Sequence, residues 1–138
     1  MIVMSRVVHA EISELPRIPL TIADHELHAE VAYTQQARTR GLMFRLKMTE
    51  NAGMLFVFPQ NAYYGMWMRN TIIPLSVAFI NEKGVILNIA DMEPCALKAH
   101  HSAGPVKYAL EMNRGWFAHR KIQAGEYVSG LEHAPAAE

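Results

Sequence analysis

The stretch LSVAFINEKGVILNI, residues 75–89, decides the fold of this chain most clearly. Large apolar residues alternate with small residues over residues 75–80, the polar NEKG segment follows, and residues 85–89 form a second, mostly apolar run. A period of two is typical of β-strands, and two such runs joined by a short turn containing glycine predict a β-hairpin. The chain therefore contains at least one antiparallel strand pair.

Further strand signals lie on both sides of this hairpin. Alternation over residues 18–22 and 27–33 predicts a second hairpin, and the continuous apolar run of residues 54–58 predicts a strand covered on both faces. Residues 106–112 alternate again, and residues 126–131 can close the sheet. Many short strands favour a mostly β (α+β) protein, a single compact antiparallel β-barrel-like domain, because a closed barrel leaves few strand edges exposed.

Two short helices complete the expected fold. Thr34 can cap a helix over residues 35–40, which Gly41 ends because glycine tolerates positive φ. Asn113 can cap a second helix over residues 114–121, whose basic last turn suits the negative end of the helix dipole.

Composition limits the domain organisation and the classes of partner. The chain has 138 residues, 51% of them hydrophobic, and a net charge of zero. We expect a loosely ordered segment over residues 1–17, one domain over residues 18–131 and a flexible tail over residues 132–138. The neutral chain has no general attraction to nucleic acid, which we therefore do not expect as a partner.

The sequence also bears on the membrane and on the cellular compartment. Its apolar runs are far shorter than the ~20 residues that a membrane-spanning helix needs. The first residues lack the run of roughly 7–15 apolar residues that is typical of a secretory signal. We expect a soluble protein without a membrane span, whose compartment and oligomeric state the sequence leaves open.

Signatures of catalysis and of cofactor binding are absent from the sequence. The single cysteine, Cys95, excludes an intrachain disulfide and a multi-cysteine metal site. The donor-rich stretch of residues 91–101 follows no zinc-ligand spacing, and the motifs of serine hydrolases, zinc proteases and phosphate-binding loops do not occur. We therefore expect no metal, no cofactor and no catalytic residue, and an enzyme is the less favoured class.

Five residues are candidates for a ligand site: Trp67, Arg69, Asn70, Thr71 and Glu111. In an extended chain Trp67 and Arg69 share a face, so the guanidinium can lie beside the indole and present its donors to a carboxylate, a phosphate or a sugar hydroxyl. Glu111 has apolar neighbours, so its carboxyl either has a partner or has a raised pKa. The alternative is structural: Trp67 anchors the core and Arg69 pairs with Glu111.

Charged residues form a local basic patch, which we define as Arg38, Arg40, Arg45 and Lys47. Such a patch can bind an acidic protein partner or a phosphate through Arg38, Arg40 and Arg45, and a solvated turn surface is the alternative.

A different charged series lies at Glu26, His28 and Glu30, which share one face of a predicted strand. Neighbouring members of the series would stand ~7 Å apart, so the three cannot meet one metal ion from a regular strand. We expect a solvated outer face here.

Four motifs follow one another along the chain: GLMFR at residues 41–45, GMLFVF at 53–58, MWMRNT at 66–71 followed by PL at 74–75, and YALE at 108–111 followed by Gly115. In this order they resemble the motifs of the bacterial and archaeal family catalogued as domain of unknown function 192 (DUF192). The resemblance extends from about residue 18 to residue 131. It implies a compact barrel-like β fold with short helices and no assigned activity. Family members often carry signal peptides or lipoprotein leaders, which are not evident here, and Arg69 replaces the family's lysine.

The observations favour a non-catalytic binding module. Its ligand would be a polar small molecule, saccharide-like or anionic, in a pocket edged by the five candidate residues. One alternative is an enzyme that uses Glu111 as general acid or base and Arg69 as electrostatic stabiliser. Another is a protein-interaction domain that uses the basic patch. A cavity beside an exposed Trp67 and Arg69 favours binding, and a second titratable group next to Glu111 favours the enzyme.

Overall fold

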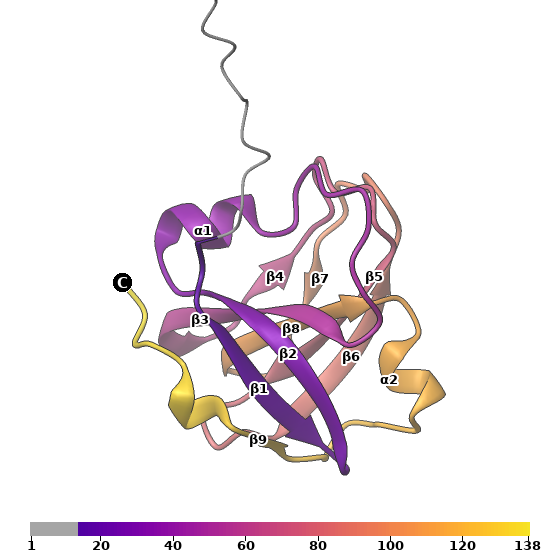
Figure 1. Ribbon diagram of the computed structural model, residues 1–138. Coiled ribbons are helices and arrows are strands. Elements are labelled where there is room, and N and C mark those ends of the chain that lie inside the picture. Colours follow the sequence, from indigo (N-terminus) through magenta and orange to yellow (C-terminus); the bar gives the residue numbers. More distant parts are fainter. Residues whose placement is uncertain (1–13) are drawn as a thin grey trace, which may run out of the picture.

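The computed structural model describes residues 14–138, and a curled sheet of seven strands that forms a half-barrel dominates it (Figure 1). The strands are β1 (Arg17–Ile22), β2 (His25–Ala32), β3 (Ala52–Ala62), β5 (Leu75–Ile80), β6 (Ile86–Met92), β8 (Val106–Asn113) and β9 (Val128–Ser129). Their spatial order is β6-β5-β8-β3-β2-β1-β9. A small second sheet pairs β4 (Gly65–Met66) with β7 (His100–His101). The predicted mostly β, barrel-like fold is confirmed.

Strand pairing follows the predicted hairpins and adds one parallel pair. The hairpins β1–β2 and β5–β6 are both antiparallel, as expected. The pair β2–β3 is parallel, from His28 beside Ala52 to Ala32 beside Phe56. Parallel neighbours need a long crossover connection, and here residues 33–51 provide it. This crossover, which contains the first helix, forms one wall of the pocket described below.

The first helix, α1 (Gln35–Arg40), has the predicted bounds and caps. The Thr34 hydroxyl accepts a hydrogen bond from the Ala37 amide at 3.1 Å, and Gly41 ends the helix with a φ of 50°.

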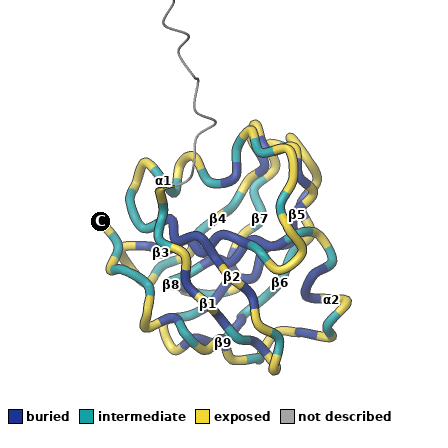
Figure 2. Tube along the Cα trace, in the orientation of Figure 1, coloured by how far each residue is buried: buried dark blue, intermediate teal, exposed yellow. Residues whose placement is uncertain are grey.

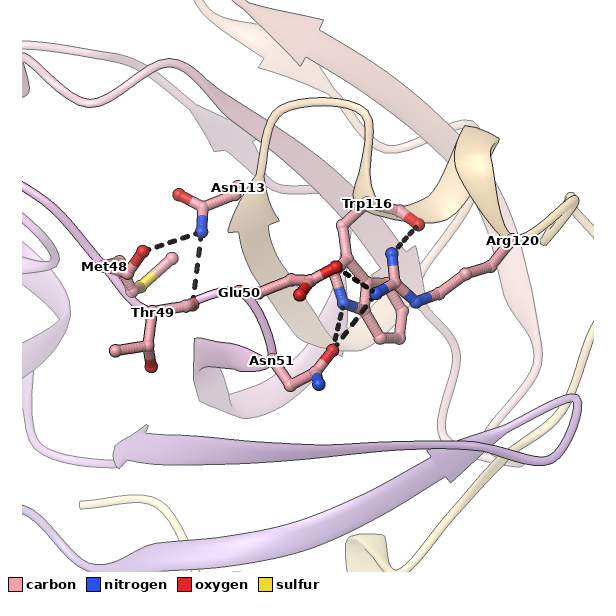
Figure 3. A network of polar contacts seen from close by, with 7 residues as sticks. All are labelled: Met48, Thr49, Glu50, Asn51, Asn113, Trp116 and Arg120. Atoms are coloured by element: carbon pink, nitrogen blue, oxygen red, sulfur yellow. Dashed lines mark hydrogen bonds and ion pairs between the residues drawn. The ribbon is translucent and has the colours of Figure 1, made fainter.

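The second helix is shorter than predicted. It is α2 (Trp116–His119), and Gly115 precedes it in a left-handed conformation with a φ of 85°. The prediction that Asn113 caps a helix over residues 114–121 is wrong, because Asn113 is the last residue of β8. Its side-chain amide donates instead to the main-chain oxygens of Met48 and Thr49 (Figure 3).

The core lies on both faces of the central strands. Residues 53–58 of β3 are all buried, which confirms that this strand is covered on both sides. Alternate residues of β3 and β8 enter two apolar clusters, one containing Leu55 and Leu110 and the other containing Met54 and Ala109. Figure 2 shows the buried trace running through the middle of the molecule.

One segment near the C-terminus hydrogen-bonds to strands at opposite edges of the sheet. β9 pairs with β1, while the Ile86 amide donates to the Glu126 oxygen and the Val128 amide donates to the Gly84 oxygen. Residues 126–131 thus close part of the half-barrel, as the sequence predicts.

Residues 132–138, expected to form a flexible tail, contact the domain. Ala134 and Ala137 pack against the apolar cluster, and the Glu138 amide donates to the Tyr33 oxygen at 2.8 Å. Most of the predicted N-terminal segment 1–17 lies outside the described residues. Among residues 14–138, no helix has the length and apolar character needed to cross a membrane.

Candidate functional site

A pocket of about 770 Å³ opens between the crossover and the loops that follow β3. Part of its lining comes from α1 and residues 41–43, and another part comes from β4 and residues 67–71. The end of β3 and Glu111 of β8 also line it, so the pocket reaches the central strands of the large sheet.

The structure brings all five candidate ligand residues to this pocket. Trp67, Arg69, Asn70 and Thr71 come from the loop after β4, and Glu111 comes from a strand about forty residues later. The sequence motif at residues 66–71 and the one at residues 108–111 therefore meet at one place.

Hydrogen bonds to two other loops hold the loop of residues 67–71 in place. The Phe44 amide donates to the Asn70 oxygen, and the Cys95 amide donates to the Thr71 oxygen, both at 2.9 Å. Phe44, Asn70 and Cys95 all have positive φ, which is uncommon for residues other than glycine. Such conformations persist where the surroundings fix them, so this edge of the pocket is preorganised.

Trp67 and Arg69 form the exposed edge of the pocket. The Trp67 side chain lies at the surface, with 46% of its area exposed, and the Arg69 guanidinium lies 5.6 Å from the centre of its ring. The predicted proximity of guanidinium and indole is present. The alternative that Trp67 is a core anchor is wrong.

Glu111 occupies the interior side of the pocket. It is 4% exposed and lies between Met54 of β3 and Val77 of β5, both fully buried. Within residues 14–138 the Glu111 carboxyl makes no hydrogen bond and no ion pair. Every polar side-chain atom of these residues that is fully enclosed does have a hydrogen-bond partner. The carboxyl therefore keeps a small opening, and the pocket that it lines provides that opening.

Burial raises the pKa of the Glu111 carboxyl from its ordinary value of 4.5 to about 8. Removing a carboxylate from water disfavours its charged form, and no cationic side chain offsets this penalty. Glu111 is therefore mostly a neutral acid at pH 7, able to donate a hydrogen bond. The predicted alternative, a structural pair of Arg69 with Glu111, is not formed in the described part of the chain.

The residues of the basic patch have separate roles in the structure. Arg38 and Arg40 line the pocket. Arg38 also donates to the main-chain oxygens of Tyr33, Val57 and Glu138 at 2.7–3.0 Å. A role of Arg38, Arg40 and Arg45 in binding a protein partner stays a prediction.

Arg45 forms a two-pronged ion pair with Glu30, with N–O distances of 2.6 and 3.0 Å. The expectation of a solvated face at Glu26, His28 and Glu30 is wrong for Glu30, which is buried. The crossover returns Arg45 to β2, and no local sequence signal reports this pairing.

Sequence reasoning missed the aromatic wall of the pocket. The rings of Phe58 and Tyr64 stack with centroids 3.8 Å apart and an angle of 9° between planes, and both residues line the pocket. The Tyr64 hydroxyl donates to the Gln60 oxygen at 2.8 Å. The only sequence signal for this wall is that Tyr64 lies two residues before the MWMRNT motif.

A separate polar network lies away from the pocket and fixes the end of the crossover (Figure 3). The indole of Trp116 donates to Asn51, and the Arg120 guanidinium bonds to both Asn51 and Glu50 at 3.2 Å. The same guanidinium lies 4.4 Å from the centre of the Trp116 ring. These contacts connect the end of the crossover to α2, and none of the residues involved lines the pocket.

Metal-ligand geometry is not found in the described residues. Within residues 14–138, no three His, Cys, Asp or Glu side chains lie close enough together to hold one ion. In the donor-rich stretch, Asp91 accepts a hydrogen bond from Ser76, and both Asp91 and Glu93 lie within ion-pair distance of Arg114.

Comparison with known proteins assigns the family. The family model of DUF192, described as an uncharacterized ACR, matches residues 18–130. The chain belongs to the DUF192 family. No curated protein shows significant similarity to it.

Two solved structures share this DUF192 fold. A protein of unknown function from Novosphingobium aromaticivorans is 31% identical, with a TM-score of 0.81 over 87% of this chain and 89% of its own. A protein from Sinorhizobium meliloti, described as a candidate transcription regulator, is 34% identical, with a TM-score of 0.78 over 83% of this chain and 92% of its own. Both similarities cover most of each chain, so the fold is shared over one compact unit.

Proposed function

We propose that this DUF192 protein is a non-catalytic binding module for a small polar molecule, held in the pocket between Trp67 and Glu111. The observation that carries the proposal is the Glu111 carboxyl, which is buried, has no partner within residues 14–138 and opens into the pocket. A buried polar group without a hydrogen bond costs free energy, on the order of 1–3 kcal/mol. A ligand that accepts a hydrogen bond from this acid would remove that cost.

The size and lining of the pocket support the same function. Its volume of about 770 Å³ falls within the roughly 300–1,000 Å³ of small-molecule sites. Apolar and aromatic side chains form most of its wall, while a few polar groups converge on it, and such a mixture binds and orients a small ligand.

The test is a binding screen that reports the location of each ligand. Backbone amide NMR spectra of the protein would be recorded with a panel of sugars, organic anions, amines and nucleosides. We expect at least one class to shift the signals of residues 67–71 and of Glu111. The Trp67→Ala variant should weaken this binding, whereas Tyr127→Ala, which removes an exposed aromatic ring remote from the pocket, should not. A panel in which no compound shifts the pocket signals contradicts the proposal.

A second candidate function is an enzyme in which Glu111 is the general acid. The observation that favours it is the pKa of about 8, because a carboxyl that is protonated near neutral pH can donate a proton during a reaction. However, within residues 14–138 no second titratable side chain is hydrogen-bonded to Glu111. The Glu111→Gln variant separates the two functions, since it would abolish proton transfer and leave a binding site with a hydrogen-bond donor intact.

A further inference from the structure

At pH 7 the charged side chains among the described lining residues of the pocket are of one sign. Arg38, Arg40 and Arg69 line it, and Glu111 is the only carboxyl side chain among its described lining residues. Because burial keeps that carboxyl mostly neutral at pH 7, the lining residues that the structure describes carry cationic groups and no opposing carboxylate. Clefts lined by charges of one sign attract ligands of the opposite sign.

Arg69 is the cation best placed to receive such a ligand. It is exposed, and within residues 14–138 its described contact is with the Trp67 ring rather than with an acidic side chain. Arg45 provides the contrast, because Glu30 occupies its guanidinium in a two-pronged ion pair. A guanidinium can form the same planar, two-pronged pair with the carboxylate of a ligand as with the carboxylate of a glutamate.

The two polar ends of the pocket are separate. Arg69 lies on the exposed edge and Glu111 in the interior, and no ion pair joins them in the described chain. The same pocket is also lined by apolar surfaces, which include the stacked rings of Phe58 and Tyr64. A ligand that contacts both ends must therefore present two polar groups on an apolar body.

From this arrangement we infer the ligand class: a small organic anion whose anionic group pairs with Arg69, whose ring or short apolar body lies along Phe58 and Tyr64, and whose uncharged oxygen accepts a hydrogen bond from Glu111. The inference rests on the proposed binding function and decides between the two ligand chemistries compatible with the sequence. A neutral saccharide would leave the cationic edge without a counter-charge.

The inference requires binding to depend on pH. Ionised Glu111 can no longer donate a hydrogen bond, and its charge would repel an anion in the same pocket. With a pKa of about 8, the neutral form falls from about nine-tenths at pH 7 to about one-tenth at pH 9. Anion affinity should therefore be about tenfold weaker at pH 9 than at pH 7.

The experiment compares probes that differ in one group. 4-(Hydroxymethyl)benzoate carries both polar groups, 4-(hydroxymethyl)benzamide lacks the charge, and glucose represents a saccharide. Each would be titrated to about 10 mM, above the roughly millimolar Kd of fragment-sized ligands, and followed by NMR at residues 67–71 and at Glu111. We expect the benzoate to bind more tightly than the benzamide and glucose at pH 7.

Variants assign the two ends. Arg69→Gln should weaken benzoate binding about tenfold, as expected for the loss of a charge-assisted contact, and should weaken benzamide binding less. Glu111→Gln, whose amide donates a hydrogen bond but does not ionise, should bind benzoate with equal affinity at pH 7 and pH 9. Lys83→Gln, which removes a surface cation outside the pocket lining, is the matched control and should change neither.

The outcomes separate the ligand class from the function. Benzamide or glucose binding as tightly as benzoate, or an Arg69→Gln variant with unchanged benzoate affinity, would overturn the anion class and leave the binding function standing. Failure of all three probes and of the wider panel to shift the pocket signals would overturn the binding function itself.

Discussion

Arg69 and Glu111 line the same pocket, but no ion pair joins them in the described part of the chain. Burial raises the pKa of Glu111 to about 8, and Arg69 does not contribute to that shift. The two side chains therefore act as separate polar ends of one cavity instead of as a structural pair. This separation makes the pocket suitable for a ligand that spans it.

The first prediction concerns stability and pH. The folded protein retains the Glu111 proton up to about pH 8, whereas the unfolded chain releases it above about pH 4.5. Between these values the unfolded state binds fewer protons, so Glu111 lowers the free energy of unfolding as pH rises, by about 1.4 kcal/mol per pH unit. Glu111→Gln removes this effect and should be more stable than the wild type by on the order of 4 kcal/mol at pH 8.

Urea denaturation at pH 5, 6.5 and 8 would measure this difference. The control is Glu82→Gln at an exposed turn position, which should stay within about 0.5 kcal/mol of the wild type throughout. A Glu111→Gln variant whose advantage does not grow with pH would contradict the raised pKa.

The second prediction concerns the pair of Arg45 with Glu30. Arg45→Met removes the two-pronged ion pair that Arg45 makes with the buried Glu30 carboxylate and should cost about 3 kcal/mol of unfolding free energy. The double variant Arg45→Met with Glu30→Gln also removes the buried negative charge and should recover part of that loss. A double-mutant cycle in urea measures the coupling, and coupling near zero would show that the pair does not hold the crossover to β2.

The third prediction uses two glycines with similar backbone angles. Gly130 and Gly125 have φ of 101° and 97°, but a Cβ at Gly130 would lie 2.7 Å from the Pro19 oxygen, whereas a Cβ at Gly125 would meet nothing within 4 Å. Gly125→Ala should therefore cost about 1 kcal/mol for backbone strain alone, and Gly130→Ala about 3 kcal/mol. Thermal unfolding of both variants tests the difference, and equal losses would contradict the close contact of β9 with β1.

The fourth prediction concerns the network around Trp116. Arg120 is largely buried and contacts Glu50, Asn51 and the Trp116 ring, so Arg120→Met should cost about 1–2 kcal/mol. Arg114→Met breaks a more exposed ion pair and should cost about 0.5 kcal/mol or less. Chemical denaturation compares the two, and the reverse order would contradict a stabilising role for the network.

Local sequence signals predict the strands and α1 because the information lies within each segment. The alternation of residues 75–80, the apolar run of residues 54–58 and the Thr34 cap each involve neighbours along the chain. The predicted second helix is too long because the prediction used local signals, such as the basic residues of its last turn. The hydrogen bonds of Asn113 to residues far away in the sequence, which prevent it from capping a helix, leave no local signal.

The site depends more on tertiary structure. The MWMRNT motif and Glu111 are evident as unusual residues, but their meeting in one pocket follows from the parallel pairing of β2 with β3 and from the crossover that this pairing requires. The Arg45–Glu30 pair and the Phe58–Tyr64 stack arise from the same long-range arrangement. The residue types in the sequence therefore identify candidate residues for the ligand site, whereas the residues that form the walls of the pocket are known only from the fold.

The most direct test of the account is a titration of the Glu111 carboxyl, followed by its side-chain carbon signal in NMR, with and without 4-(hydroxymethyl)benzoate. We expect a midpoint near pH 8 in the free protein and a higher midpoint with the anion present, because the ligand binds the neutral acid. A free-protein midpoint near 4.5, or a midpoint that saturating anion leaves unchanged, would contradict it.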